Sequence, residues 1–160
     1  MRNIKLFLMI TVLMIGIVIP PGLIHAQESW VKKLAYQYKE AIANIQNFCI
    51  EKAKVECELL EMEQNPPLLR EGQVIDYIGV RQRGVVYFYL VVAEKEDMDP
   101  DIYLFDSRGR VLKSEGGDAT GSVDLAIHVP EYTQKVTHRI KMFKGSGHIA
   151  VAILAPVGGN

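Results

Sequence analysis

Residues 85–112 read VVYFYLVVAEKEDMDPDIYLFDSRGRVL, in which apolar runs rich in valine, tyrosine and phenylalanine alternate with short polar turns. Runs of this length and composition are typical of β-strands. The pattern extends in both directions, and the strands it predicts are 74–80, 85–93, 101–105, 110–113, 122–129, 136–143 and 148–154. Because no helical segment separates these runs, we expect an antiparallel β-sandwich or barrel rather than a parallel sheet.

A long helix is predicted upstream of Asn65-Pro66-Pro67, since residues 29–64 contain neither glycine nor proline. Apolar residues recur there every three or four positions, as one face of a helix requires: Trp30, Leu34, Tyr38, Ile42, Ile45, Cys49, Ala53, Cys57 and Leu60. Asn44 and Asn47 mark the break if the segment is two helices. The predicted fold class is therefore α+β, with a long N-terminal helix in residues 27–65 and a jelly-roll-like antiparallel sandwich in residues 68–157.

The N-terminus has the three-part layout of a secretory signal peptide. Arg2 and Lys5 precede an uncharged apolar run over residues 6–19, and Ala26 supplies a small residue before a cleavage point. We expect residues 1–26 to be removed and the mature protein to be periplasmic or secreted. The alternative is a retained membrane anchor, because the uncharged stretch 6–24 approaches the length that spans a bilayer.

The charge balance limits the class of partner. The whole chain carries 18 basic and 19 acidic residues. A protein so close to neutral has no strong positive field, so a nucleic-acid-binding role is not expected.

The β region resembles the bacterial pre-peptidase C-terminal (PPC) domain family over about residues 70–155. The resemblance rests on Asp99-Pro100-Asp101-Ile102-Tyr103, on the turn Asp106-Ser107-Arg108-Gly109, and on a closing strand pair around Gly145-Ser146-Gly147. It implies a small jelly-roll-like β-sandwich on a secreted protein. The chain departs from the family pattern in having no peptidase domain, and Glu131-Tyr132-Thr133 replaces the frequent Gly-x-Tyr.

A weaker resemblance is to extracytoplasmic PAS-like (Cache) sensor domains. These also place a long helix after the export segment and carry a strand–Asp-x-x-Gly–strand hairpin, as residues 101–113 do here. The resemblance implies a ligand pocket and a link to a membrane. The chain lacks the second membrane segment that such sensors normally have.

The acidic residues around the 94–106 turn form a candidate calcium site, since calcium takes six to eight oxygen ligands. The predicted ligands are Glu94, Asp97, Asp99, Asp101 and Asp106. The PPC resemblance adds that Asp99 and Asp101 match aspartates used near a calcium site in some domains of that family. The alternative interpretation is a solvated turn. No other cofactor is predicted.

The only two cysteines, Cys49 and Cys57, both fall on the apolar face of the predicted helix. Eight helical residues separate two Cα atoms by about 12 Å, whereas a disulfide needs less than about 7 Å. Unless the helix is broken there, each thiol is either reduced or bonded to another chain. We favour these two outcomes. The apolar face of the helix is longer than the sandwich can cover, so it predicts a homodimer through the N-terminal helix, which a disulfide between chains would lock.

Four glutamates crowd the end of the predicted helix at positions 56, 58, 61 and 63. Anions are unfavourable at a helix C-terminus, so the glutamates either form a solvated acidic end or dock on a basic surface. The candidate basic residues are Arg81, Arg83, Arg108 and Arg110, of the same chain or of a neighbour.

The sequence favours a non-catalytic role, because no nucleophile and base can be placed together. We expect an exported binding or assembly module whose partner is a protein or a polysaccharide, with membrane contact only if the N-terminal segment is retained. Two alternatives remain at this point: a PAS-like extracytoplasmic ligand sensor and a small secreted hydrolase.

Overall fold

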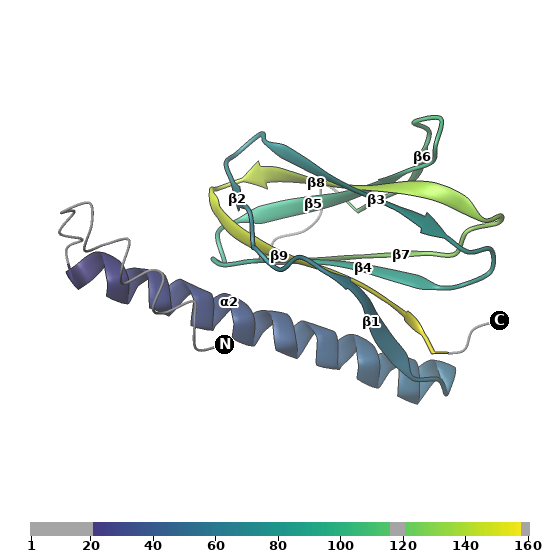
Figure 1. The fold of residues 1–160 in the computed structure, drawn as a ribbon, viewed down its shortest axis with the longest axis horizontal. Helices are drawn as coiled ribbons and strands as arrows, with labels where there is room; N and C mark the ends of the chain where they lie inside the picture. The colour runs from purple at the N-terminus through teal and green to yellow at the C-terminus, as the bar shows by residue number, and fades with distance from the viewer. Residues whose placement is uncertain (1–20, 116–120, 158–160) are drawn as a thin grey trace, which may run out of the picture. The chain divides into compact units, whose positions relative to one another are not determined.

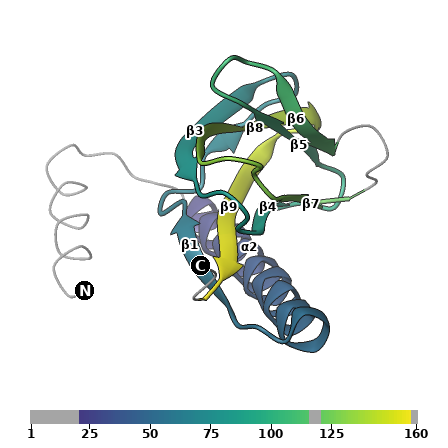
Figure 2. The same ribbon diagram turned by 90° about the vertical axis from the view of Figure 1, so that its right-hand side faces the viewer.

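The structure, a computed structural model, describes residues 21–115 and 121–157. Two antiparallel sheets stack face to face (Figures 1 and 2). One sheet has the order β1-β9-β4-β7, with β2 also paired to β9, and the other has the order β3-β8-β5-β6. The strands are β1 (Cys57–Met62), β2 (Leu68–Leu69), β3 (Val74–Arg81), β4 (Tyr87–Ala93), β5 (Asp99–Phe105), β6 (Val111–Glu115), β7 (Val123–His128), β8 (Gln134–Lys144) and β9 (Gly147–Pro156).

This architecture confirms the predicted α+β class with a helix followed by an antiparallel sandwich. Each of the seven strands predicted downstream of the prolines is present, with its bounds shifted by a few residues at most. The sequence pattern missed β1 and β2. Both pair with β9, so they form because of residues about 80 to 100 positions away rather than because of their own periodicity.

The helix α2 (Pro21–Phe48) begins at a proline, which is well tolerated in the first turn of a helix. Gly22 lies in that first turn and does not interrupt the helix. Residues 1–20, which hold most of the predicted signal peptide, lie outside the described residues, and the predicted cleavage point after Ala26 falls within α2. Within the part of the chain that the structure describes, no helix is long and apolar enough to cross a membrane.

The predicted continuous helix over residues 29–64 is wrong in its C-terminal third. The α-helix ends at Phe48, and a π-helical turn (Cys49–Ala53) follows it. Lys54 then adopts a left-handed conformation with φ of 56°, and the Val55 N–H donates to the Cys49 carbonyl at 3.3 Å. This turn reverses the chain into β1, where Cys57 is buried but Leu60 is exposed, so the apolar period of the predicted helix does not continue beyond the turn.

The cysteine prediction is corrected as well, because Cys49 and Cys57 form a disulfide within one chain. Their Cα atoms are 6.0 Å apart, a separation that a helix cannot give at this spacing but a reversed chain can. No free cysteine remains in the molecule. An intermolecular disulfide, and the covalent dimer that it would hold together, are therefore withdrawn.

The sandwich core lies between the two sheets and is filled by apolar side chains. Alternate residues of β4, among them Tyr89 and Val91, point into this core together with Ile140 of β8 and Ile153 of β9. The intervening residues of β4 are buried too, since every residue of that strand is buried. A strand that is apolar on both faces needs a second layer over its outer face.

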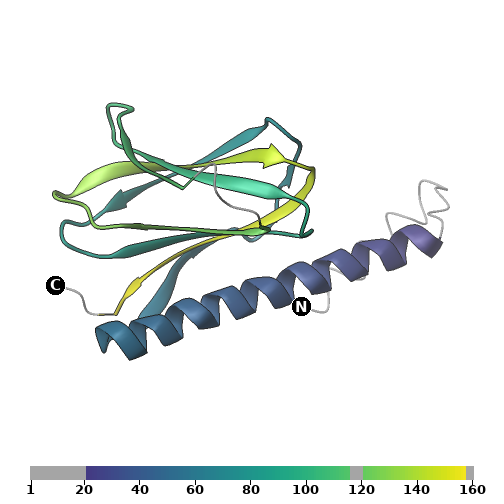
Figure 3. The same ribbon diagram turned by 180° about the vertical axis from the view of Figure 1, so that it is seen from behind.

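Residues 33–48 of α2 supply that second layer (Figures 1 and 3). Leu34, Tyr38 and Ile45 are buried on the face that meets the five-stranded sheet. The Tyr38 hydroxyl donates to the Val151 carbonyl of β9 at 3.3 Å, and the Gln46 side chain donates to the Cys57 carbonyl at 3.2 Å. Residues 33–160 consequently form one compact unit.

One of the crowded glutamates does dock on a predicted basic residue of the same chain. Glu61 of β1 accepts two hydrogen bonds from the buried guanidinium of Arg81, at 2.7 and 3.1 Å. Arg81 also donates to the Tyr89 hydroxyl at 3.3 Å. The pair ties β1 to β3, one strand from each sheet, at one margin of the sandwich.

Candidate functional site

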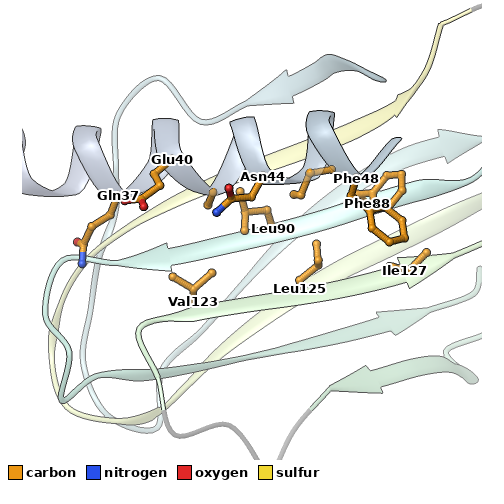
Figure 4. Close-up of a pocket in the computed structure, with 11 residues that line it drawn as sticks. Gln37, Glu40, Asn44, Phe48, Phe88, Leu90, Val123, Leu125 and Ile127 are labelled. Atoms are coloured by element: carbon orange, nitrogen blue, oxygen red, sulfur yellow. The ribbon is translucent and has the colours of Figure 1, made fainter. Parts of the chain in front are cut away.

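An apolar groove lies between α2 and the outer face of β4 and β7 (Figure 4). Its volume is about 460 Å³, within the roughly 300–1,000 Å³ typical of ligand sites. The groove exists because residues 33–48 of α2 leave β7, the last strand of the five-stranded sheet, without cover. Val123, Leu125 and Ile127 of β7 are accordingly 44%, 37% and 42% exposed.

The strand geometry explains why these three side chains point into the groove. Successive side chains of a strand face opposite sides of the sheet. Asp124 and Ala126 turn toward the sandwich interior and are buried, so Val123, Leu125 and Ile127 must turn outward. Phe88 and Leu90 of the neighbouring strand β4 lie beside them and form the deeper part of the groove.

The helix supplies the opposite wall, which is more polar than the sheet. Gln37, Glu40 and Asn44 lie along α2 on the side that faces the groove, and Figure 4 places Gln37 at one end of it. The other end is closed by Phe48, whose ring meets that of Phe88 edge to face with centroids 6.3 Å apart. The groove thus has an apolar floor and a rim with hydrogen-bonding capacity.

Two features of that rim bear on what it could hold. The Oε1 atom of Gln37 is buried and has no hydrogen-bond partner within the described ranges, so it can accept a hydrogen bond from a ligand. Among the groove-lining side chains that the structure describes, Glu40 is the one ionisable residue. The groove therefore favours a neutral or basic occupant over an anionic one.

The open edge of β7 is modified by Asp124, an acidic side chain that points inward. Its carboxylate accepts hydrogen bonds from the backbone N–H of Leu125 at 2.8 Å and from that of Ile102 in β5 at 2.9 Å. The Leu125 N–H is therefore not free for another strand. Inward-pointing charges on edge strands are a known means of discouraging strand addition.

Of the five predicted calcium ligands, Glu94, Asp101 and Asp106 have hydrogen-bond partners within the chain, whereas one carboxylate oxygen each of Asp99 and Asp101 is buried without a partner among the described residues. Glu94 contacts His148, with its Oε2 2.7 Å from the ring Nδ1 and 2.8 Å from the backbone N–H. Burial opposes ionisation of Glu94, but these hydrogen bonds outweigh it and lower the pKa of the carboxyl. Glu94 thus serves to hold the start of β9 against the end of β4.

Asp106 is occupied within its own turn between β5 and β6. It accepts from the backbone N–H groups of Arg108 and Arg110 at 2.8 and 2.9 Å, and from the Arg110 side chain at 2.6 Å. The hydrogen bond from the Arg110 backbone contributes most to lowering the pKa of Asp106. Asp106 thus uses three hydrogen bonds to close its own turn.

Asp99 and Asp101 lie two residues apart on β5. Asp101 accepts from the Tyr103 hydroxyl at 3.0 Å, and burial raises the pKa of its carboxyl. Asp97 lies in the connection that precedes the strand. Among the described residues, no three histidine, cysteine or acidic side chains are grouped so that they could hold a metal ion, so the calcium site stays a prediction without geometric support.

Of the groove residues, the sequence singled out only Asn44 and Ile45, and it did so for the shape of the helix rather than for a binding site. The signal for them is the alternation in residues 123–127, where valine, leucine and isoleucine share one face of a strand. The alternation shows that the strand has an apolar face and a second face, but it does not show which face another element of the fold covers. The answer depends on where α2 docks and how wide the sheet is, which are properties of the assembled fold.

Compared with known proteins, the chain matches no protein-family model and no curated protein sequence. The argument for function therefore rests on the residues of the groove itself.

Proposed function

We propose that this protein is an exported, non-catalytic binding module whose binding site is the groove between α2 and strands β4 and β7. Two sequence features support export: the three-part N-terminus and a fold consistent with the resemblance to PPC-like sandwiches of secreted proteins. The Cys49–Cys57 disulfide is compatible with a periplasmic or extracellular location, because disulfides persist in oxidising compartments.

The observation that carries the proposal is the row of exposed apolar side chains at positions 123, 125 and 127, next to a preformed apolar wall. Contiguous exposed apolar surface rimmed by polar groups marks interaction sites. Full burial of one such side chain is worth roughly 1.5–3 kcal/mol, so covering the groove would stabilise a complex appreciably.

The occupant that fits best is an amphipathic helix of a partner protein with a basic flank. One helix, about 10 Å wide, covers about two strands, and α2 leaves an uncovered strip beside it on β4 and β7. From Gln37 to Phe48 the groove runs along twelve residues of α2, a rise of about 16 Å, which matches three turns of a partner helix. Asp124 argues against a strand as occupant, and Glu40 favours a lysine or arginine on the partner.

The test uses two designed 18-residue amphipathic peptides that share a leucine face, one with lysines and one with glutamates on the polar face. Fluorescence anisotropy should give tighter binding for the lysine peptide. Leu125→Asp should weaken that binding at least tenfold, because it places a charge on the groove floor. Glu40→Lys should reduce the preference for the lysine peptide by about two- to fivefold, as expected for an exposed ion pair.

The matched control is Ile78→Asp, which adds the same charge to an outward-facing residue of β3 in the other sheet, where the side chain is 60% exposed. It should leave peptide binding unchanged. Equal binding by wild type and Leu125→Asp would contradict the proposal, provided both proteins give the same circular dichroism spectrum. A dimer in size-exclusion chromatography that Leu125→Asp dissociates would instead identify the helix of a second copy as the occupant.

The second candidate function is ligand sensing, which the same groove favours because it lies between helix and sheet. A sensor would bind a small apolar molecule there and transmit the change along α2. The discriminating probe is decan-1-ol: a raised melting temperature with decan-1-ol, together with no binding of either peptide, would replace the partner-helix proposal by the sensor.

A further inference from the structure

A second pocket, unlike the groove in chemistry and in position, lies at the end of the sandwich where the β5–β6 turn approaches the β7–β8 connection. Its volume is about 500 Å³. Three short apolar side chains contribute to it, but most of its lining is polar: Asp106, Arg110, His128, Glu131, Tyr132 and Gln134. Both hydrogen-bond donors and acceptors therefore line one hollow of ligand size.

The walls of this polar pocket are held in place by contacts within the chain. The Asp106 turn is closed by its three hydrogen bonds from Arg108 and Arg110. On the other side, the Gly84 N–H donates to the Pro130 carbonyl at 2.9 Å, and the Arg83 N–H donates to the Thr133 hydroxyl at 3.1 Å. Because the walls are already ordered before a ligand arrives, little conformational entropy is lost on binding.

Two polar atoms of the pocket-lining residues are buried without a partner. Gln134 is only 9% exposed, and its Oε1 has no hydrogen-bond partner among the residues described. The Nε2 atom of His128 is in the same position. A buried polar atom without a partner is costly, so a small rotation of either side chain toward the pocket would let a ligand supply the missing hydrogen bond.

The charges of the pocket favour a neutral ligand over an ionic one. The Arg110 guanidinium is already neutralised by Asp106 at 2.6 Å, and Glu131 adds a negative charge to the lining. Burial lowers the pKa of His128, so its ring is neutral near pH 7 and each ring nitrogen can act as donor or acceptor according to tautomer.

Tyr132 gives the pocket an aromatic surface. Its ring is 49% exposed, and its hydroxyl is held by the Arg110 guanidinium at 3.4 Å. An exposed ring beside hydrogen-bonding groups suits a ligand with one apolar C–H face and several hydroxyl groups. Hydroxyl groups both donate and accept, which is what the Gln134 acceptor and the neutral His128 ring require.

We propose that this polar pocket is a saccharide-binding site, which takes a neutral sugar unit against the Tyr132 ring with hydroxyl groups bonded to Gln134 and His128. The proposal is independent of the apolar groove. With it, the protein has two binding sites: the groove for a protein partner and the polar pocket for a neutral polysaccharide.

The experiment is isothermal titration calorimetry with three probes: cellohexaose, chitohexaose and oligogalacturonate, of which the last is anionic. At least one neutral oligosaccharide should bind the wild-type protein more tightly than oligogalacturonate does. Tyr132→Ala should weaken that binding at least tenfold. Gln134→Leu should weaken it similarly while leaving the melting temperature unchanged or raised, because leucine removes an acceptor that has no partner.

Leu125→Asp is the matched control, since it damages the groove and should leave saccharide binding intact. The experiments can therefore contradict the groove proposal without contradicting the saccharide proposal, and the reverse. The saccharide site is overturned if neither neutral oligosaccharide binds at millimolar concentration, if the anionic probe binds best, or if the Tyr132 and Gln134 variants bind like the wild type.

Discussion

At the residue scale, His138 is the side chain whose environment has the clearest consequence. It is fully buried in the sandwich, with its ring 5.1 Å from that of Tyr89 and 6.0 Å from that of Tyr77. Neither ring nitrogen has a hydrogen-bond partner within residues 21–115 and 121–157. Burial, reinforced by the positive charge of Arg81 and opposed only by Asp76, lowers the pKa of His138 to about 3.

This pKa predicts acid sensitivity with a defined sign. The unfolded chain binds a proton at His138 below a pKa of about 6.5, whereas the folded chain does not until about pH 3. The free energy of unfolding should therefore fall as the pH drops from about 6.5 toward 3, by up to about 1.4 kcal/mol per pH unit from this group. Urea unfolding at pH 7, 5.5 and 4.5 measures the slope.

His138→Phe should flatten that slope and leave stability at pH 7 unchanged or improved, since it removes two unpaired polar atoms. The matched control is His148→Phe, because His148 is partly exposed and contacts Glu94. That variant should retain most of the slope. If the two variants lose the same amount of acid sensitivity, the effect does not come from burial of His138.

At the scale of elements, the end of α2 is fixed by the disulfide. The Cys49–Cys57 bond closes a short loop around the π-helical turn, with a sequence separation of eight residues. Closing a loop of this size stabilises a fold by about 2–3 kcal/mol in the chain-entropy treatment. Reduction with a phosphine should lower the melting temperature of the wild type by several degrees, which scanning calorimetry can measure.

A variant with both Cys49→Ser and Cys57→Ser should melt near the reduced wild type, and the reductant should not change its melting temperature. An equal response of wild type and double variant would show that the reductant acts elsewhere. Since Phe48 closes one end of the groove next to this turn, the double variant should also bind the lysine peptide less tightly.

The same region shows how far sequence reasoning reaches. Strands such as β4 and β8 are predictable because their own residues carry the signal: β4 is apolar throughout and β8 alternates. Residues 57–62 read Cys-Glu-Leu-Leu-Glu-Met, which favours a helix by propensity. They form β1 because β9 offers a neighbouring edge and Cys49 a covalent anchor, and neither is visible in the local sequence.

The two candidate sites were hidden for the same physical reason. The polar pocket joins residues from the β5–β6 turn and the β7–β8 connection, such as Arg110 and Tyr132, which are 22 positions apart. The local sequence predicts that each of these residues lies in a turn, but it does not predict that the two turns meet. Conversely, the acidic cluster around residues 94–106 was conspicuous in the sequence, but folding gives its members separate partners such as His148 and Arg110.

At the scale of the whole molecule, residues 33–160 form one compact unit. A chain that begins at Lys33 should therefore lose only the helical signal of residues 21–32 in circular dichroism and melt within a few degrees of the full chain. If export removes residues 1–26, mass spectrometry should find a mature protein that begins at Gln27 and contains this unit intact. A chain from Lys33 that is unfolded, or an exported product still starting at Met1, would contradict these expectations in turn.

The position of β9 has a consequence for when the protein can fold. This strand comprises the last ten residues of regular structure, and it bonds to β1, β2 and β4. The five-stranded sheet therefore cannot assemble while residues 147–156 are still inside a ribosome tunnel or a membrane channel. Pairing of the first strand with the last is slow to form, because the longest loop must close first. The five-stranded sheet of a chain built in this order assembles only after residues 147–156 have left the tunnel or channel.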